Sequence, residues 1–172
     1  MTDMGKLIEP VIPGLRRYAN ALVRDPAEAD DLVQDCLERA VARWGQRRAD
    51  GDTRSWLYAI LHNLAVNRWR ALRRRGVMAP IQAVDQAFLS VAPAQEHGLA
   101  RADVLRALDR LPDDYRAVIL LVTVEGLSYA ETARVLDVPL GTIMSRLSRG
   151  RARLASEMAE GAPARTHLRR VK

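Results

Sequence analysis

Side chains that can hydrogen-bond to DNA gather in one segment near the end of the sequence. Between Pro139 and Leu154 there are four arginines and no acidic residue. Helical spacing would place Ile143, Leu147 and Gly150 together with Leu154 on one buried face. The polar side chains around the rest of this helix are Thr142, Ser145, Arg146, Ser148, Arg149 and Arg153. Arginine can bind guanine through two hydrogen bonds, so the pattern predicts a helix that reads duplex DNA.

The arginines of this helix fall on two different sides. Arg149 would lie on the outer face with Ser145 and Ser148, where we expect it to read a base. Arg146 and Arg153 would lie toward the flank of the helix, where we expect them to hold phosphates.

A short helix is predicted immediately before this segment. Ser128 and Glu131 have the spacing of a capping box, and the apolar pattern continues to Leu136. The turn "DVPL" then joins the two helices, which is the layout of a helix-turn-helix. A solvated basic helix in an ordinary bundle is the alternative that this pattern leaves open.

Charge is segregated along the chain. The formal net charge is +6, which favours a polyanionic partner, although a genome rich in arginine codons would give the same excess. The positions are more informative than the total. Residues 25–38 contain six carboxylates and no base, whereas residues 54–75 contain six arginines and no acid. This separation predicts two surfaces with different partners.

Residues suited to catalysis or metal binding are not brought together by any spacing in the sequence. The three histidines are scattered, and there is no glycine-rich phosphate loop and no nucleophile paired with a base. We therefore expect no enzyme activity, no cofactor and no metal. The single cysteine, Cys36, allows no internal disulfide and favours a reducing compartment. With no signal peptide and no apolar run long enough to span a bilayer, we expect a cytoplasmic protein without membrane insertion.

The elements that must position these side chains are all predicted to be helices. Alanine, leucine and arginine dominate, and no pair of alternating strands flanks a hairpin turn. In the first part of the chain, apolar spacing predicts helices over 13–23, 26–44 and 54–74, the second opened by Asp25 and the third by Asp52 or Thr53. The core side of the second helix is expected to include Leu37 and Val41.

Later in the chain, a helix from about residue 99 should end before Pro112, and the next should end at Gly126. The weak pattern between these blocks is typical of a connecting segment. The predicted fold is therefore all-α, with two small helical domains at 1–76 and 99–160 and a flexible linker at 77–98. A disordered basic tail is expected at 161–172.

Two stretches resemble a known family. "LPDDYRAVILLVTVEGLSYAETARVLDVPLGTIMSRLSRGRARL" resembles the carboxy-terminal DNA-binding domain of bacterial sigma factors. "AEADDLVQDCLERAVARW" with "WLYAILHNLAVNRWRALRRR" resembles their second conserved region. Because the chain contains only these two regions, it resembles the extracytoplasmic-function branch of the sigma-70 family. The resemblance covers roughly residues 10–75 and 99–157.

This resemblance implies a partner for the acidic helix and a set of further partners. Asp31, Gln34 and Asp35 match the positions that dock on the β′ clamp helices of core RNA polymerase. The β flap of the core enzyme, promoter DNA and an anti-sigma factor are the other partners that the family implies.

The resemblance also implies roles in reading the promoter. The residues that match minus-ten contacts are Asn63, Asn67, Arg68, Arg70, Arg73 and Arg74. A flipped base needs a pocket, and the loop Gln46–Thr53 is its expected rim. The last helix would read the minus-thirty-five element. The family often has a basic residue where this chain has Met144, which puts one of those contacts in doubt.

Four aromatic side chains have no role that the motifs assign. We expect His62 to be an exposed helix residue and Trp44 and Trp56 to be core, while Trp69 fits either base stacking or packing.

Two other functions are left open. An autonomous helix-turn-helix regulator would need a way to dimerise, which the sequence does not offer. A sigma-like decoy that binds an inhibitor would not need the DNA-reading arginines.

Overall fold

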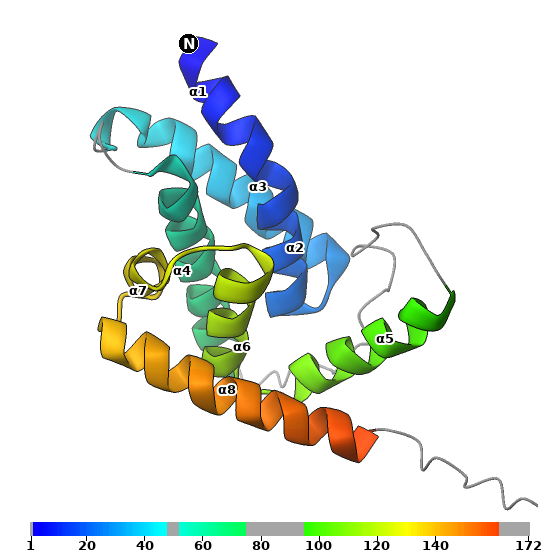
Figure 1. Cartoon of the computed structure of the whole chain (residues 1–172). Helices are drawn as coiled ribbons and strands as arrows, with labels where there is room; N and C mark the ends of the chain where they lie inside the picture. Colours follow the sequence, from blue (N-terminus) through cyan, green and yellow to red (C-terminus); the bar gives the residue numbers. More distant parts are fainter. Residues whose placement is uncertain (1, 48–51, 75–94, 162–172) are drawn as a thin grey trace, which may run out of the picture.

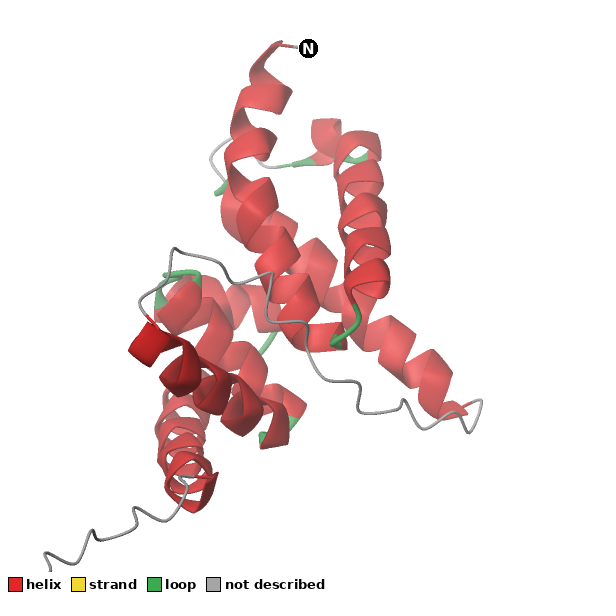
Figure 2. Cartoon of the chain, turned by 90° about the vertical axis from the view of Figure 1, so that its right-hand side faces the viewer, coloured by secondary structure: helices red, strands yellow, loops and turns green. Residues whose placement is uncertain are grey.

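The structure is a computed structural model that describes residues 2–47, 52–74 and 95–161. Within these ranges every regular element is a helix and there is no strand, as Figures 1 and 2 show. The prediction of an all-α fold is therefore confirmed. No helix in the described ranges has the length and apolarity that a membrane crossing requires.

The first unit contains the elements up to residue 74. They are α1 (Thr2–Ile8), η1 (Glu9–Val11), α2 (Ile12–Val23), α3 (Pro26–Ala42), η2 (Trp44–Gln46) and α4 (Thr53–Arg74). α2, α3 and α4 pack against one another around a common core. Asp25 opens α3 as predicted, because its side chain accepts a hydrogen bond from the Glu28 amide at 2.9 Å. Asp52 opens α4 by accepting from the amides of Arg54 and Ser55.

The second unit contains the elements from residue 95 onward. They are α5 (Gln95–Arg110), α6 (Asp113–Ile119), η4 (Leu120–Val124), α7 (Tyr129–Leu136) and α8 (Leu140–Gly161). Gly126 ends the α6–η4 helix as predicted, since it has a φ of 67° that favours glycine. The predicted capping box is also present: the Ser128 amide donates to Glu131 and the Glu131 amide donates to Ser128.

The two units are packed together in this structure. α7 lies across α4, and α6 approaches α2, as Figure 1 shows. Buried side chains of both units form one continuous apolar cluster that includes Leu15 and Leu61 from the first and Leu121 and Ile143 from the second. We call this packing the closed arrangement.

Several boundaries differ from the sequence analysis, among them the end of α3, which lies at Ala42 rather than at residue 44. Helix α1 was not predicted, because its short apolar pattern precedes Pro10 and Pro13. α5 begins at Gln95, inside the predicted linker of 77–98, and α8 runs to Gly161, one residue beyond the predicted end of the second domain. Residues 75–94, which make up most of that linker, and the predicted tail from 162 onward lie outside the described residues.

We predict that replacing Ser128 with Ala lowers the free energy of unfolding by about 1 kcal/mol, because the amide of Glu131 loses its acceptor. Urea unfolding followed by circular dichroism measures this difference. Ser156→Ala, at an exposed position of α8, is the control and should change the same quantity by less than about 0.5 kcal/mol. Equal effects of the two changes would show that the hydrogen bond of the cap does not add to the free energy of unfolding.

Candidate nucleic-acid interface

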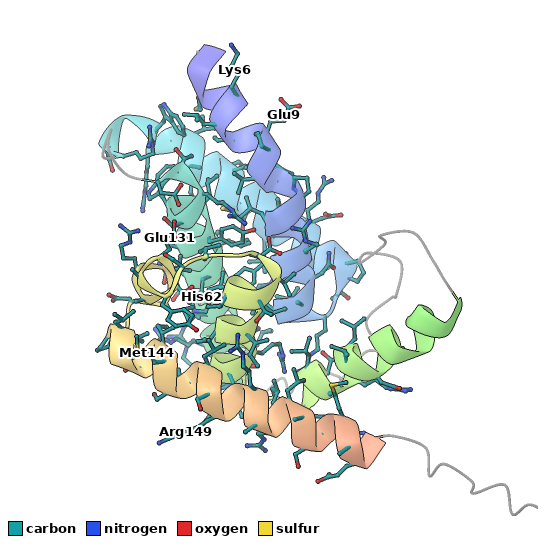
Figure 3. The ribbon with its side chains drawn as sticks, viewed as in Figure 1. Lys6, Glu9, His62, Glu131, Met144 and Arg149 are labelled. Atoms are coloured by element: carbon teal, nitrogen blue, oxygen red, sulfur yellow. The ribbon has the colours of Figure 1, made fainter. Side chains whose placement is uncertain are left out.

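Helix α8 has the buried side and the polar side that the sequence predicts. Ile143 and Leu147 are buried, and Gly150 lies so close to α6 that an added Cβ would be 3.1 Å from Ile119 Cδ1. Close packing against α6 thus fixes which face of α8 is turned outward. The predicted DNA-contacting side chains that are exposed are Met144, Ser145, Ser148, Arg149 and Arg153, while Thr142 is half-buried. Figure 3 shows Arg149 pointing away from the other helices.

Arg146 is held by another helix of the same unit. Its guanidinium lies 2.7 Å from a carboxylate oxygen of Asp114, and its side chain is only 26% exposed. In the predicted role Arg146 holds a DNA phosphate, but here its charge is already paired. The pair connects α8 to the start of α6 and so helps to fix the tilt of α8.

The predicted minus-ten side chains form a continuous surface on α4. Asn67, Arg70, Arg73 and Arg74 line one open hollow. Asn63 is exposed one turn before them on the same helix. A hollow lined by arginines and an amide can hold the backbone of a single strand while a base meets the amide.

Two arginines of the predicted minus-ten set are paired inside the protein. Arg68 lies 3.5 Å from Glu28 in the first unit, and Arg73 lies 3.6 Å from Asp113 in the second. The Arg73 side chain is 80% exposed, so this contact costs little to break.

The predicted pocket rim, Gln46–Thr53, is described in part. Residues 48–51 lie outside the described ranges. Of the four remaining rim residues, Gln46, Arg47 and Asp52 line a hollow with Trp56, and Thr53 is buried. Arg134 of α7 lines the same hollow, so the second unit reaches the edge of the expected base pocket. Trp44 and Trp56 are half-buried and meet edge to face, with ring centroids 6.1 Å apart. Trp69 is half-buried against the core.

The acidic face of α3 is open to solvent. Asp31, Gln34 and Asp35 are all exposed, and the Gln34 amide donates to Glu38 at 3.0 Å. The prediction that Val41 belongs to the core is wrong, because its side chain is 53% exposed. Val41 follows Gln34 by seven residues, so it lies on the same face of the helix. The surface therefore combines acids with one apolar side chain, which charge patterning alone did not indicate.

The prediction that His62 is exposed is also wrong. Its ring is mostly buried beside Tyr18, and Tyr18 Oη and His62 Nδ1 share a hydrogen bond of 3.0 Å. Figure 3 places it in the interior between α4 and α6. Burial, the largest cause, lowers the pKa of His62 to about 4; Asp114 opposes this effect and the charge of Arg146 adds to it. The ring is therefore neutral at pH 7.

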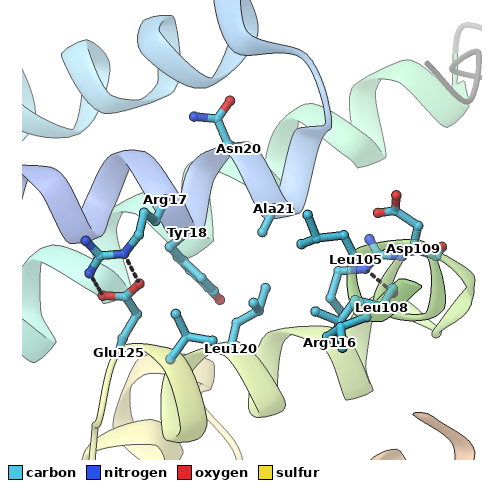
Figure 4. Close-up of a pocket in the computed structure, with 12 residues that line it drawn as sticks. Arg17, Tyr18, Asn20, Ala21, Leu105, Leu108, Asp109, Arg116, Leu120 and Glu125 are labelled. Carbon is cyan, nitrogen blue, oxygen red and sulfur yellow. Dashed lines mark hydrogen bonds and ion pairs between the residues drawn. The ribbon is translucent and has the colours of Figure 1, made fainter. Parts of the chain in front are cut away.

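Glu125 is the charged residue that sequence reasoning missed. Its side chain is 1% exposed and lies at the contact between the two units (Figure 4). Arg17 donates to both of its carboxylate oxygens, at 3.2 and 3.0 Å, and the Tyr58 hydroxyl donates to Oε2 at 2.6 Å. Arg54 donates to its backbone carbonyl. Because Glu125 is 67 to 108 residues away from its side-chain partners, no local pattern could have revealed it.

Helix α2 comes unusually close to this carboxylate. A Cβ added to Gly14 would lie 2.3 Å from Tyr58 Oη and 2.7 Å from Glu125 Oε2. Only glycine leaves room for the two groups to meet against α2. We call Arg17, Tyr58 and Glu125 the Glu125 cluster.

The described residues contain no candidate site for metal or thiol chemistry. No group of three or more His, Cys, Asp or Glu side chains in these ranges is placed to hold a metal ion. Cys36 is buried, and burial raises the pKa of its thiol to about 12, so it is protonated and unreactive at pH 7.

Family models match both units. Residues 8–62 match a model described as the Sigma2 domain of PhyR, and residues 101–154 match one described as Sigma-70, region 4. The two matches lie in the order of the two resemblances found in the sequence; the second has nearly the same bounds, whereas the first ends at residue 62 and does not reach Asn63 or the arginines after it.

Whole-chain comparisons agree with the domain matches. The chain is 34% identical over 148 residues to the ECF RNA polymerase sigma factor EcfG of Rhodopseudomonas palustris, covering 84% of this chain and 79% of that protein. It is 38% identical to SigM of Mycobacterium tuberculosis, covering 82% and 69%. Among solved structures, the sigma factor RpoE of Bartonella quintana in complex with the anti-sigma factor NepR matches with a TM-score of 0.77 and 30% identity. That match covers 94% of this chain and all of the other.

We predict that the protein loses stability as the pH falls from about 6.5 to about 4. The unfolded chain then binds a proton on His62 that the folded protein excludes. Stability is retained above pH 6.5. At pH 5 the loss attributable to this residue should be on the order of 2 kcal/mol. Urea unfolding at pH 7 and pH 5 measures it. His62→Asn keeps a hydrogen-bonding group near Nδ1 but cannot titrate, so an unchanged pH dependence in this variant would contradict the assignment.

Proposed function

The chain belongs to the extracytoplasmic-function (ECF) sigma factors of the sigma-70 family, and from this premise we propose how its surfaces divide the work of directing core RNA polymerase to promoters. Sigma factors are regulatory proteins, and we propose that this one has no catalysis of its own. The observation that carries the proposal is the separation of an exposed acidic face on α3 from two arginine-bearing faces on α4 and α8. One surface suits a protein partner and two suit DNA.

The acidic face of α3 is the proposed contact with the β′ clamp helices. Asp31, Gln34 and Asp35 offer exposed carboxylates and an amide, and Val41 adds an apolar contact at the C-terminal end of the same face. Charged rims speed association, whereas an apolar side chain that is buried on binding slows dissociation. The β flap is proposed as the second contact on core, and none of the surfaces described above is assigned to it.

The exposed stripe on α4 is the proposed minus-ten surface. Arg70 and Arg74 would hold the backbone of the melted strand, and Asn63 and Asn67 would meet its bases. Arg68 and Arg73 would contribute phosphate contacts once their present pairs with Glu28 and Asp113 are released. The hollow beside Gln46 and Trp56 is the proposed pocket for a flipped base.

The outer face of α8 is the proposed minus-thirty-five surface. Arg149, Ser145 and Ser148 are exposed, and Figure 3 shows Arg149 directed away from the other helices, as base reading requires. Met144 is 50% exposed on the neighbouring side, where an apolar side chain can contact a thymine methyl group. Thr142 and Arg153 would hold phosphates. Because Arg146 is paired with Asp114, we propose that it positions α8 more than it contacts DNA.

An anti-sigma factor is the proposed regulator. The support is the likeness to RpoE of B. quintana, which was solved in complex with the anti-sigma factor NepR. We further propose that the protein acts in the cytoplasm, where promoter DNA and polymerase are found.

A sigma-like decoy is the second candidate, favoured by the match of residues 8–62 to the Sigma2 domain of PhyR. A decoy would bind an inhibitor without directing transcription. It would not need the exposed arginines of α8, whereas this chain has Arg149, Arg151 and Arg153 there. Transcription with core polymerase separates the two candidates, because only a sigma factor would give transcripts.

We predict that the protein added to core polymerase gives transcripts from a subset of a genomic fragment library, and that the sequences upstream of the start sites share two elements.

We also predict that Asp31→Lys with Gln34→Ala weakens binding to core about tenfold or more, because a charge at the interface is reversed. Co-purification and transcript yield measure this. Glu9→Lys reverses a charge at another exposed site and is the control. Specific inhibitor binding without any transcript would favour the decoy.

We predict that Arg149 reads sequence and that Arg153 contributes affinity. Arg149→Ala should relax the preference at one base pair and cost about 1–3 kcal/mol there. Arg153→Ala should weaken all sequences alike and lower the salt slope by about one unit. Binding is measured on the preferred minus-thirty-five element and all its single-base variants, at several salt concentrations. If the two variants exchanged these behaviours, α8 would sit in the groove in a rotated position.

A further inference from the structure

An apolar hollow lies at the contact between α7 and the first half of α8. The residues that line it are Tyr129 of α7 and Met144, Leu147, Ser148 and Arg151 of α8. The four residues of α8 have the spacing i, i+3, i+4 and i+7, so they form one stripe along the side of the helix that is next to α7. Figure 3 shows Met144 near the start of α8, at the end where α7 lies. We call this feature the Met144 hollow.

The Met144 hollow exposes apolar side chains that the core does not use. Met144 is 50% exposed and Tyr129 is 38% exposed, whereas Leu147 at the base of the hollow is buried. Ile143 and Leu147 are the buried residues that hold this part of α8 against the rest of the unit. Exposed apolar side chains that gather in one place mark a binding surface more often than scattered ones do.

The charge around the Met144 hollow favours DNA over a protein as the partner. Residues 139–156 contain four arginines and no acid. Arg151 lines the hollow itself, and Arg149 is exposed on the same helix. Phosphates follow both edges of the major groove, so arginines at the rim suit a helix that lies in the groove. The apolar part of the hollow would then meet the edge of a base.

The major groove offers one apolar group that could fill such a hollow. It is the C5-methyl group of thymine, because the other groups that identify a base there are hydrogen-bond donors or acceptors. The Ser148 hydroxyl can donate to O4 of thymine or accept from N4 of cytosine, so it does not distinguish the two pyrimidines. Met144 has a flexible and polarisable side chain that can pack around a methyl group. Discrimination between the two pyrimidines therefore depends on the methyl group.

We propose that the Met144 hollow binds the C5-methyl group of a pyrimidine in the minus-thirty-five element, so that it accepts thymine or 5-methylcytosine and disfavours cytosine or uracil. This inference rests on the proposed function, and it names the chemical group that one part of α8 reads. It also makes binding responsive to methylation of the promoter, because 5-methylcytosine carries the same methyl group on the same ring atom as thymine.

The test uses the full-length protein with core polymerase and a duplex promoter obtained from the fragment library. Each thymine of the minus-thirty-five element is replaced in turn by deoxyuridine, which removes the methyl group and nothing else. At one position this change should weaken binding about fourfold, which is the ratio expected for burial of one methyl group. Cytosine at that position should bind more weakly than thymine, and 5-methylcytosine should recover about the same factor of four.

Variants of the hollow test whether the methyl group meets Met144. Met144→Ala should bind the thymine and deoxyuridine promoters with nearly equal affinity, because the side chain that covers the methyl group is removed. Tyr129→Ala should reduce the difference as well. The matched control is Met158→Ala, which removes a methionine that is 37% exposed on the same helix and outside the hollow. This control should keep the full difference between the two promoters.

Three results would overturn the inference, and they are distinguishable. Selective binding that is the same with thymine and deoxyuridine at every position would overturn it and leave the proposed function standing. A Met144→Ala variant that keeps the methyl effect but associates more weakly with core polymerase would overturn it too, because the hollow would then meet a protein such as the β flap. A protein that binds no promoter selectively with core polymerase would contradict the proposed function, and the inference with it.

Discussion

The arrangement of this molecule depends on one buried carboxylate. The Glu125 side chain is 1% exposed, and a buried carboxyl group is costly unless charged and hydrogen-bonding partners replace water. Arg17 supplies the charge in a two-point contact, and Tyr58 supplies a hydroxyl. These partners belong to helices of the other unit, so the position of α6–η4 against α2 and α4 is fixed by a requirement for charge neutralisation. α7 follows η4 directly and is placed across α4 as a result.

Such a contact determines geometry more than it adds stability. Replacing both partners of a buried ion pair by apolar groups often leaves the stability of the protein unchanged. Removing only one partner leaves the other charge buried without a counter-ion and lowers the stability. The apolar cluster that spans both units supplies most of the attraction between them. The Glu125 cluster favours the observed placement of α6–η4, because Arg17 and Tyr58 satisfy the carboxyl group there.

The sequence predicted local structure well and long-range structure poorly. Helix starts at Asp25 and Ser128 and the stop at Gly126 follow from hydrogen bonds within a few residues, so they are legible in the sequence. The exposed faces of α3, α4 and α8 follow from helical period. His62 and Val41 were misassigned because period alone does not say whether another helix covers a given face. Glu125, Tyr58 and Arg17 could be joined only by the tertiary fold.

The arginines illustrate the same limit and explain why total charge is a poor guide to DNA contacts. Arg116 is buried and donates to the carbonyls of Leu108 and Leu111 at the end of α5, where it replaces the missing turn of that helix. Arg146 pairs with Asp114 and braces α8. Both are basic residues, yet Arg116 holds α5 and α6 together and Arg146 orients α8, the helix proposed to read DNA. Arginines such as Arg149, which stay exposed because no acid of the chain reaches them in the described structure, are the ones whose charge remains available to a phosphate or a base.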